Sequence, residues 1–244
     1  MELLFLGVGE ACDENFPNTS ILIYDKNMIL LDCGFSVPHI FFKYHNDPDE
    51  LDMIWISHFH GDHFLGTPLM ILRFWEMGRV KPLYFIGQKG IEEKIKTAME
   101  LAYPSFIKKL KYDLIFVELE PMDKTSVLNF SFQAAYTNHS IKNMALRIEG
   151  SKSLYYSGDG KPTSESILLA KDCDLIIHEC FLTKGELEGH GSLEMAIDFA
   201  QNAGVKKLAL VHMQRDEREK LKLKEIDPGR IELLVPNSGT RILL

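Results

Sequence analysis

Four side chains that can bind a metal ion stand within six positions of the stretch SHFHGDHFLG, namely His58, His60, Asp62 and His63. They follow the apolar run LDMIWI, whose composition is typical of a buried strand. Alternate residues of an extended chain point the same way, so His58 and His60 face one point as the strand ends. Gly61 permits a tight turn, which places Asp62 and His63 on its other side. Two pairs of ligands that face a shared space suit two metal ions better than a single tetrahedral ion.

The alternative for this stretch is a surface loop that holds its histidines by chance. A lone histidine would fit that interpretation. Four residues of ligand type directly after a core strand do not, and the stretch therefore predicts a metal site.

The elements that position these residues are visible as short apolar runs bounded by turn residues, and as longer amphipathic segments. Strands are expected at 2–6, 20–25, 28–34, 51–57, 82–87, 113–119, 127–136, 143–150, 153–159, 174–180, 206–213, 231–235 and 239–244. Helices are expected at 37–45, 67–78, 88–103, 163–172, 192–204 and 215–226.

The order of these elements indicates the architecture. Each half opens with consecutive strands and then mixes helices with strands, which suits two sheets packed face to face with helices outside. A simple alternating barrel would need a more regular repeat of strand and helix. The 244 residues contain no repeat or linker, so one domain over residues 1–244 is expected.

Composition narrows the class of protein. The formal charge of −8 argues against a uniformly basic nucleic-acid binder. None of the four cysteines forms a CxxC pair, which argues against a cysteine zinc knuckle and suits a reducing compartment. The N-terminus makes a poor signal peptide, and no run reaches the ~20 apolar residues of a membrane helix. We therefore expect a cytoplasmic protein that has no membrane partner.

The stretch HxHxDH resembles the metal-binding signature of the metallo-β-lactamase fold, and four further residues match that fold in order and in position at strand ends. They are Asp32 in ILLDCG, His139 in AYTNHS, Asp159 in YYSGDG and His212 in LALVHM. The resemblance covers nearly the whole chain. It implies an α/β fold that is a four-layer αββα sandwich.

The resemblance also implies a dinuclear site. The implied ligands are His58, His60 and His139 for one ion, Asp62, His63 and His212 for the other, and Asp159 as the bridge between them. Asp32 would orient the HxHxDH loop by hydrogen bonding. Nitrogen and oxygen ligands suit zinc, with manganese or iron as alternatives. Oxygen-reducing di-iron relatives carry a glutamate where this chain has His60, and this difference favours hydrolysis.

Taken singly, three of these residues have plainer interpretations. Asp159 follows a glycine and suits a turn, His139 suits a cap of the NHS turn, and His212 suits a satisfied histidine at a strand end. Together these alternatives are hard to sustain. Two divalent ions would leave a cationic focus that attracts anionic substrates, and they would lower the pKa of bound water from ~15.7 towards ~7.

A second segment resembles the ribonuclease Z branch of this fold. Its HEAT-like strand end and later HST-like turn correspond here to HEC(F), residues 178–181, and HGS, residues 190–192. The resemblance implies that His190 is the general acid, that Glu179 orients it, and that a metal-bridging hydroxide attacks the substrate. Asp62 is counted among the catalytic residues as well as the ligands. The alternative for His190 is a loop histidine that caps the helix starting at Ser192.

Two departures from that branch narrow the substrate. Members that mature transfer RNA carry a long inserted arm, in many short forms between the third histidine and the bridging aspartate. Here His139 and Asp159 are only 20 positions apart, and the HST-like turn has Gly191 in its middle. Both points argue against transfer-RNA processing. Relatives without the arm hydrolyse small or cyclic phosphodiesters, and a small or nucleotide-like phosphodiester is the expected partner.

Other functions remain open at this point. A lactonase or glyoxalase-like hydrolase of carboxylic esters or thioesters would use the same metal core without His190 as an acid. A metal-binding module without catalysis is a third reading, against which the intact ligand set argues. The basic stretch 106–113 could contact RNA, although such a run is more often a solvated face. The segment 37–45 could form the surface of a homodimer.

Overall fold

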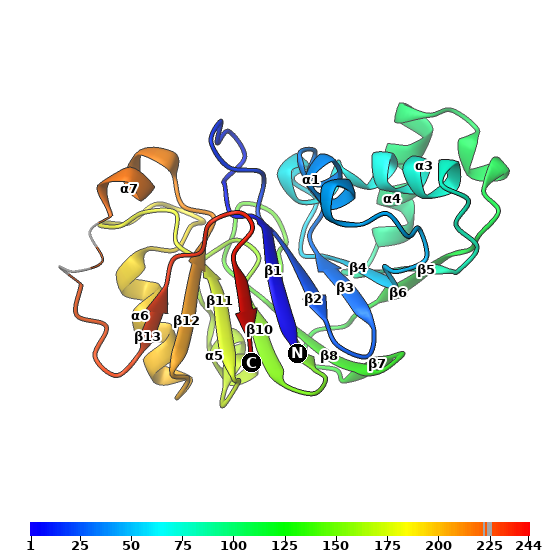
Figure 1. Cartoon of the computed structure of the whole chain (residues 1–244). Helices are drawn as coiled ribbons and strands as arrows, with labels where there is room; N and C mark the ends of the chain where they lie inside the picture. The colour runs from blue at the N-terminus through cyan, green and yellow to red at the C-terminus, as the bar shows by residue number, and fades with distance from the viewer. Residues whose placement is uncertain (222, 224–225) are drawn as a thin grey trace.

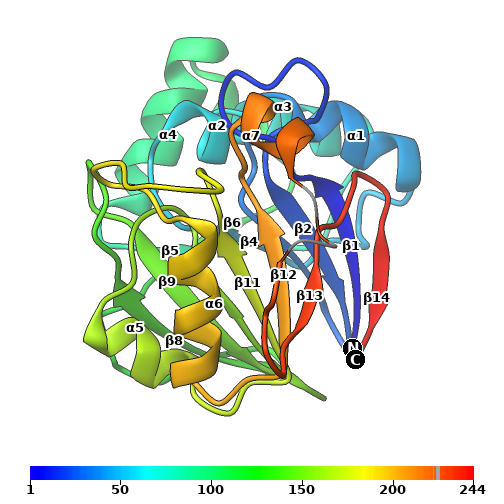
Figure 2. The same ribbon diagram turned by 90° about the vertical axis from the view of Figure 1, so that its left-hand side faces the viewer.

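The computed structural model describes residues 1–221, 223 and 226–244. Two seven-stranded sheets pack face to face, and helices cover the outer face of each (Figure 1). This arrangement is the predicted four-layer αββα sandwich. Figure 2, turned by 90°, shows the two sheets side by side, with most of the long connecting loops gathered at one end.

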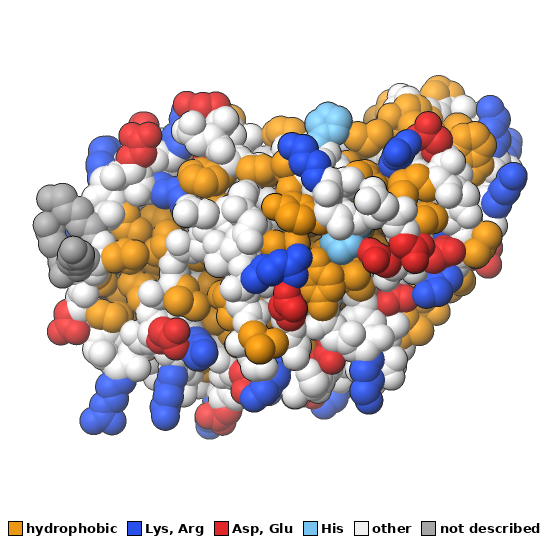
Figure 3. Space-filling view, viewed as in Figure 1, with side chains coloured by type: hydrophobic (Ala, Val, Ile, Leu, Met, Phe, Trp, Pro, Cys, Tyr) orange, Lys and Arg blue, Asp and Glu red, His pale blue; other side chains and the backbone are white. Residues whose placement is uncertain are grey.

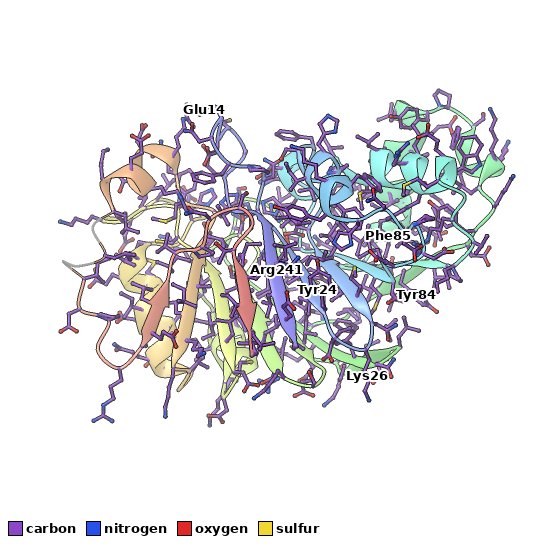
Figure 4. The ribbon with its side chains drawn as sticks, viewed as in Figure 1. Glu14, Tyr24, Lys26, Tyr84, Phe85 and Arg241 are labelled. Carbon is purple, nitrogen blue, oxygen red and sulfur yellow. The ribbon has the colours of Figure 1, made fainter. Side chains whose placement is uncertain are left out.

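The first sheet is built from the N-terminal half of the chain and its last strand. Its order is β14 (Arg241–Leu243), β1 (Glu2–Gly7), β2 (Ser20–Tyr24), β3 (Met28–Leu31), β4 (Met53–Ile56), β5 (Leu83–Gly87) and β6 (Leu114–Glu118). The pairs from β14 to β3 are antiparallel, and those from β3 to β6 are parallel. Near the β14 edge of this sheet the guanidinium of Arg241 lies 5.5 Å from the ring centre of Tyr24 (Figure 4).

The second sheet repeats this plan. Its order is β13 (Glu232–Leu234), β12 (Lys207–Val211), β11 (Leu175–Glu179), β10 (Ser153–Tyr156), β9 (Met144–Glu149), β8 (Phe130–Tyr136) and β7 (Thr125–Val127). The pairs from β7 to β10 are antiparallel and those from β10 to β13 are parallel. Each sheet therefore combines a meander with parallel strands joined by helices.

Three apolar clusters account for the layers. One lies between the sheets and includes Trp55 and Phe132, both with no exposed surface. The other two lie between each sheet and its helices. The helices are α1 (Val37–Tyr44), α2 (Gly61–Phe64), α3 (Thr67–Glu76), α4 (Ile91–Ala102), η1 (Phe106–Lys109), α5 (Ser164–Ala170), α6 (Leu193–Asn202) and α7 (Arg215–Lys220). Strands with both faces covered need apolar residues at nearly every position, which explains runs such as MILL and MIWI.

The structure differs from the sequence prediction at three places. The strand expected at 127–136 is a hairpin, because Leu128 takes a left-handed conformation (φ 51°) and turns the chain between β7 and β8. The residues after Gly61 form the short helix α2. The helix expected at 215–226 ends at Lys220, and residues 222, 224 and 225 of that prediction lie outside the described residues.

Caps and turns fall where the sequence signals them. Thr163 caps α5 through a reciprocal pair of hydrogen bonds with Ser166, and Ser192 caps α6. Gly204 follows α6 in the left-handed conformation, as expected for a helix end (φ 71°). In the part of the chain that the structure describes, no helix has the length and apolar character needed to cross a membrane.

Candidate metal centre and active site

The predicted site residues gather at one end of the sandwich. They follow the carboxyl ends of six strands, β3, β4, β8, β10, β11 and β12, and so come from both sheets. In the first sheet β3 and β4 run parallel. In the second sheet β10, β11 and β12 run parallel, and β8 has the same direction because β9 lies between it and β10. The carboxyl ends of the site strands in each sheet therefore lie along the same edge. That edge is where open α/β sheets commonly bind ligands.

One group of donors consists of His58, His60, His139 and Asp159, whose ligand atoms lie within 4.8 Å of one another. His60 Nδ1 lies 3.0 Å from His58 Nε2 and 3.2 Å from His139 Nε2. Asp159 Oδ2 lies 3.8 Å from the Nε2 atoms of both His58 and His139. The three imidazoles and one carboxylate oxygen thus surround a common point.

The second group consists of Asp62, His63 and His212. Asp62 Oδ2 lies 3.1 Å from His63 Nε2 and 3.2 Å from His212 Nε2. The other oxygen of Asp159, Oδ1, lies 3.4 Å from His63 Nε2 and 3.6 Å from His212 Nε2. Asp159 therefore offers one oxygen to each group, which is the arrangement expected of a bridging ligand.

The orientation of the imidazoles fits cations at both groups. The outer nitrogens are already engaged, because Nδ1 of His63 donates to Asp32 at 2.8 Å and Nδ1 of His139 donates to the carbonyl of Gly189 at 2.6 Å. Nδ1 of His58 lies 3.0 Å from the Ser57 hydroxyl. Their Nε2 atoms consequently face inward. Asp159 Oδ1 is buried and makes no hydrogen bond to the part of the chain that the structure describes. Such an orphan oxygen is costly unless a ligand satisfies it.

The charges of the second group depend on one another. Burial alone would lower the pKa of His212, but Asp159 and Asp62 raise it to about 9. For His63 burial is likewise outweighed by Asp159 and Asp32, and its pKa lies well above the usual value. The same contacts overcome burial at Asp62 and hold its pKa well below the usual range. Protons therefore occupy the space between these groups when no cation does, and cation binding displaces them.

The first group differs, because burial dominates at two of its histidines. Burial and the neighbouring His63 lower the pKa of His58 well below its usual value. Burial and His139 lower the pKa of His60. Neutral imidazoles are the form that binds metal, so this half of the site is ready for a cation at neutral pH.

Asp32 is a hub behind the HxHxDH loop. Its carboxylate accepts four hydrogen bonds, from the Ser57 amide (2.7 Å), the Ser57 hydroxyl (2.8 Å), His63 Nδ1 (2.8 Å) and the Tyr156 hydroxyl (2.7 Å). The residue is completely buried and has a left-handed backbone (φ 57°), which aspartate tolerates better than most residues. This geometry agrees with the orienting role expected of Asp32.

Asn143 performs a similar task for Asp159. Its side-chain oxygen accepts from the Asp159 amide at 3.1 Å, and its amide nitrogen donates to the Asp159 carbonyl at 2.7 Å. A Cβ at Gly158 would lie 2.4 Å from the Asn143 side-chain oxygen, so glycine is required there for this close approach. The backbone of Asp159 is thereby fixed from both sides.

His190 and Glu179 form the expected pair. Nδ1 of His190 lies 3.1 Å from Glu179 Oε2, and Glu179 is completely buried at the end of β11. Burial opposes protonation of His190, but the hydrogen bond and charge of Glu179 outweigh it and raise the pKa of the imidazole. A ligand atom of His190 lies within 4.8 Å of those of Asp159 and His212. The backbone amides of Gly160 and Gly191 hold the other oxygen of Glu179.

Sequence reasoning missed four supporting residues, which are Ser57, Asn143, Tyr156 and Phe181. Ser57 and Tyr156 immediately precede the HxHxDH and SGD stretches, so their position at strand ends was the available signal. Phe181 stands at the fourth position of the HEAT-like stretch, but that stretch assigned it no role. Asn143 carried no signal of spacing or type, because it acts through a contact between distant segments.

Comparison with known proteins places this architecture in a family. The family described as Anti-Pycsar protein Apyc1 matches residues 1–233. The chain belongs to this family.

Individual relatives include ribonucleases and other proteins of the metallo-β-lactamase fold. Ribonuclease BN from Escherichia coli O7:K1 (strain IAI39 / ExPEC) is 28% identical over 272 residues, an alignment that covers 87% of this chain and 89% of that protein. The short form of human tRNase Z, ELAC1, superimposes with a TM-score of 0.81 at 22% identity, over 100% of this chain and 99% of that one. The metallo-β-lactamase fold protein YhfI from Bacillus subtilis gives a TM-score of 0.76 at 21% identity, over 99% of each chain.

These likenesses confirm the predicted metallo-β-lactamase fold and the similarity to the ribonuclease Z branch. The structure adds clusters of histidine and aspartate that could hold metal ions. The number and identity of the ions, and the roles of the individual residues, remain predictions.

Proposed function

We propose that this chain is a dinuclear metal-dependent phosphodiesterase that acts on small, nucleotide-like phosphodiesters, with His190 as the general acid. The observation that carries the proposal is the His190–Glu179 pair, which stands beside two donor groups that share Asp159. A hydrolase that needs no proton donor for its leaving group would have no use for this pair.

The geometry of the donor residues suggests which of them would bind each ion. His58, His60 and His139 would hold one ion and Asp62, His63 and His212 the other, with Asp159 between them. Two bound divalent ions would supply an activated water and neutralise the charge that builds on the phosphoryl oxygens. Asp32 and Asn143 keep the ligands in place through hydrogen bonds. Zinc fits these nitrogen and oxygen donors, and manganese and iron are alternatives.

His190 is placed to give a proton to the departing oxygen. Glu179 engages Nδ1, so the other ring nitrogen is free to face the substrate. Burial opposes the charged form of the ring, but the hydrogen bond and charge of the buried Glu179 carboxylate raise its pKa and so stabilise the imidazolium. General acid help of this kind contributes about 10²–10⁴-fold to a rate.

The size of the expected substrate follows from what lies around the site. Between His139 and Asp159 the chain forms only the hairpin of β9 and β10, with no room for a long arm. Figure 3 shows one side of the sandwich, where acidic and basic side chains are interspersed and no continuous basic track crosses the described residues. The short hairpin between the two site residues favours a small substrate over a folded RNA.

A substrate panel tests the proposal. We expect the zinc- or manganese-loaded protein to hydrolyse bis(p-nitrophenyl) phosphate, thymidine p-nitrophenyl phosphate or cyclic nucleotides, and to lose activity with EDTA. Precursor transfer RNA, lactones and thioesters complete the panel. His39→Ala, which alters an exposed histidine on α1, serves as the control for His190→Ala.

The outcomes separate the alternatives. Turnover of thioesters or lactones that survives His190→Ala would favour the carboxylic hydrolase. Cleavage of precursor RNA in preference to small esters would overturn the substrate class. Stoichiometric metal without turnover of any compound would identify a metal-binding module.

A further inference from the structure

Phe181 packs against the proposed general acid. It follows β11 by two residues, and its ring is stacked on that of His190, with centroids 4.4 Å apart and planes inclined by 26°. The same ring lies 6.2 Å from that of His212. Phe181 therefore covers one face of His190 at the border of the second donor group.

The backbone of Phe181 is fixed at both ends. Its amide donates to the carbonyl of Gly191 at 3.1 Å, and its carbonyl accepts from the amide of Gln214 at 3.0 Å. Gly191 is the neighbour of His190, and Gln214 is two residues beyond His212. The residue thus joins the loop that carries the general acid to the strand end that carries a metal ligand.

His190 needs a second restraint besides Glu179. A single hydrogen bond to Nδ1, 3.1 Å long, fixes one atom of the ring but leaves the plane free to tilt about that atom. His139 forms an edge-to-face pair with this ring, with centroids 5.0 Å apart and planes inclined by 78°. A flat apolar surface on one face, together with this pair, defines the plane of the imidazole. The free nitrogen then has a fixed direction.

We propose that Phe181 is a positioning residue, which holds the His190 ring in the plane required for proton transfer to the leaving group. This inference rests on the proposed function, because it presupposes that His190 acts as an acid. Phe181 itself touches no reacting atom. Stacked aromatic pairs contribute an energy equivalent to about twofold to tenfold in a rate.

The leaving group distinguishes positioning from a merely structural role. A p-nitrophenolate leaves without much help from an acid, whereas the alkoxide of a sugar needs a proton. We expect Phe181→Leu to lower kcat about tenfold for a cyclic nucleotide or another sugar-ester substrate, and less than twofold for bis(p-nitrophenyl) phosphate. KM should be unchanged for both. Phe181→Tyr keeps the ring and should restore most of the rate.

A matched control is available in the other half of the chain. Phe106 is half-buried and forms an edge-to-face pair with Trp75, with centroids 4.9 Å apart, away from the donor groups. Phe106→Leu therefore removes a comparable aromatic contact and should leave the ratio of the two rates unchanged. An equal loss on both substrates with Phe181→Leu, or no loss on either, would overturn the inference.

A spectroscopic measurement tests the contact without relying on turnover. In zinc-loaded protein with labelled histidine, the ring protons of His190, identified by their absence in His190→Gln, should be shifted by the current of the stacked ring. The contribution of Phe181 to that shift should be lost in Phe181→Leu, which moves the His190 ring-proton signals, and should persist in Phe181→Tyr. His190 ring-proton signals that stay unmoved in Phe181→Leu would refute the stacking.

The two proposals fail in different ways. A wild-type protein that hydrolyses no phosphodiester refutes the proposed function, and the catalytic part of this inference with it. An active wild type whose Phe181→Leu variant keeps its full rate on sugar esters refutes the role of Phe181 alone.

Discussion

Replacing the buried Asp32 with asparagine should lower both the free energy of unfolding and the affinity for metal at the second donor group. Four donors converge on the carboxylate, at 2.7–2.8 Å. An amide has one acceptor oxygen with two lone pairs, so two of the four donors lose their partner. Each buried orphan costs about 1–3 kcal/mol, so Asp32→Asn should lower the free energy of unfolding by about 2–6 kcal/mol. The variant should still fold, because native proteins have about 5–15 kcal/mol.

The metal consequence follows from His63. Its Nδ1 donates to Asp32, and this bond sets which nitrogen faces the donor group. Loss of such an outer partner lowers metal affinity about 10–100-fold. Urea unfolding of the metal-free protein and zinc titration with a competing chelator measure the two effects separately.

A matched control exists at Asp172. It has the same left-handed backbone (φ 57°) but is exposed, and no hydrogen bond to its side chain is present in the described residues. Asp172→Asn therefore makes the same chemical change at the same backbone conformation, and should leave stability and zinc affinity unaltered. If Asp32→Asn changed the free energy of unfolding by less than 1 kcal/mol and kept full zinc affinity, the reasoning about the hub would be wrong.

Three further predictions concern the site. His190→Ala should retain its metal by elemental analysis and lose about 10²–10⁴-fold in kcat on sugar esters, whereas loss of metal would show that the residue is a ligand. Asp159→Ala should remove at least one ion and abolish turnover, and a metal content equal to wild type would contradict the bridging arrangement. In the metal-free protein, His212 has a raised pKa of about 9, so its ion pairs stabilise the fold fully below pH 6.5. This contribution is lost as the pH rises towards 9, and a melting temperature that stays constant over this range in metal-free protein would exclude it.

Sequence patterns were sufficient for the two sheets, because each strand is a short apolar run bounded by turn residues and both faces of each sheet are covered. The pattern failed at 127–136, where Leu128 and Asn129 interrupt the run without a glycine or proline to announce the turn. The helix that begins at Arg215 ends at Lys220, although the sequence beyond it is equally rich in charged residues.

For the site, the HxHxDH stretch could be interpreted from its own spacing. His139, Asp159 and His212 could be assigned only by resemblance, because each is a single residue at the end of a different strand. The partners of these residues could not be predicted at all. Asn143 and Phe181 are ordinary residue types whose importance arises only when the fold brings distant loops together.

The hydrogen bond from His139 to the carbonyl of Gly189 connects the loop that carries His190 with the first donor group. The loop that presents His190 cannot swing away without releasing Nδ1 of His139, a proposed metal ligand. Cation occupancy and loop closure are therefore thermodynamically linked, and the linkage is reciprocal. A bound ion should slow hydrogen exchange of the amides in this loop, and a molecule that seats the loop should slow the escape of the ion.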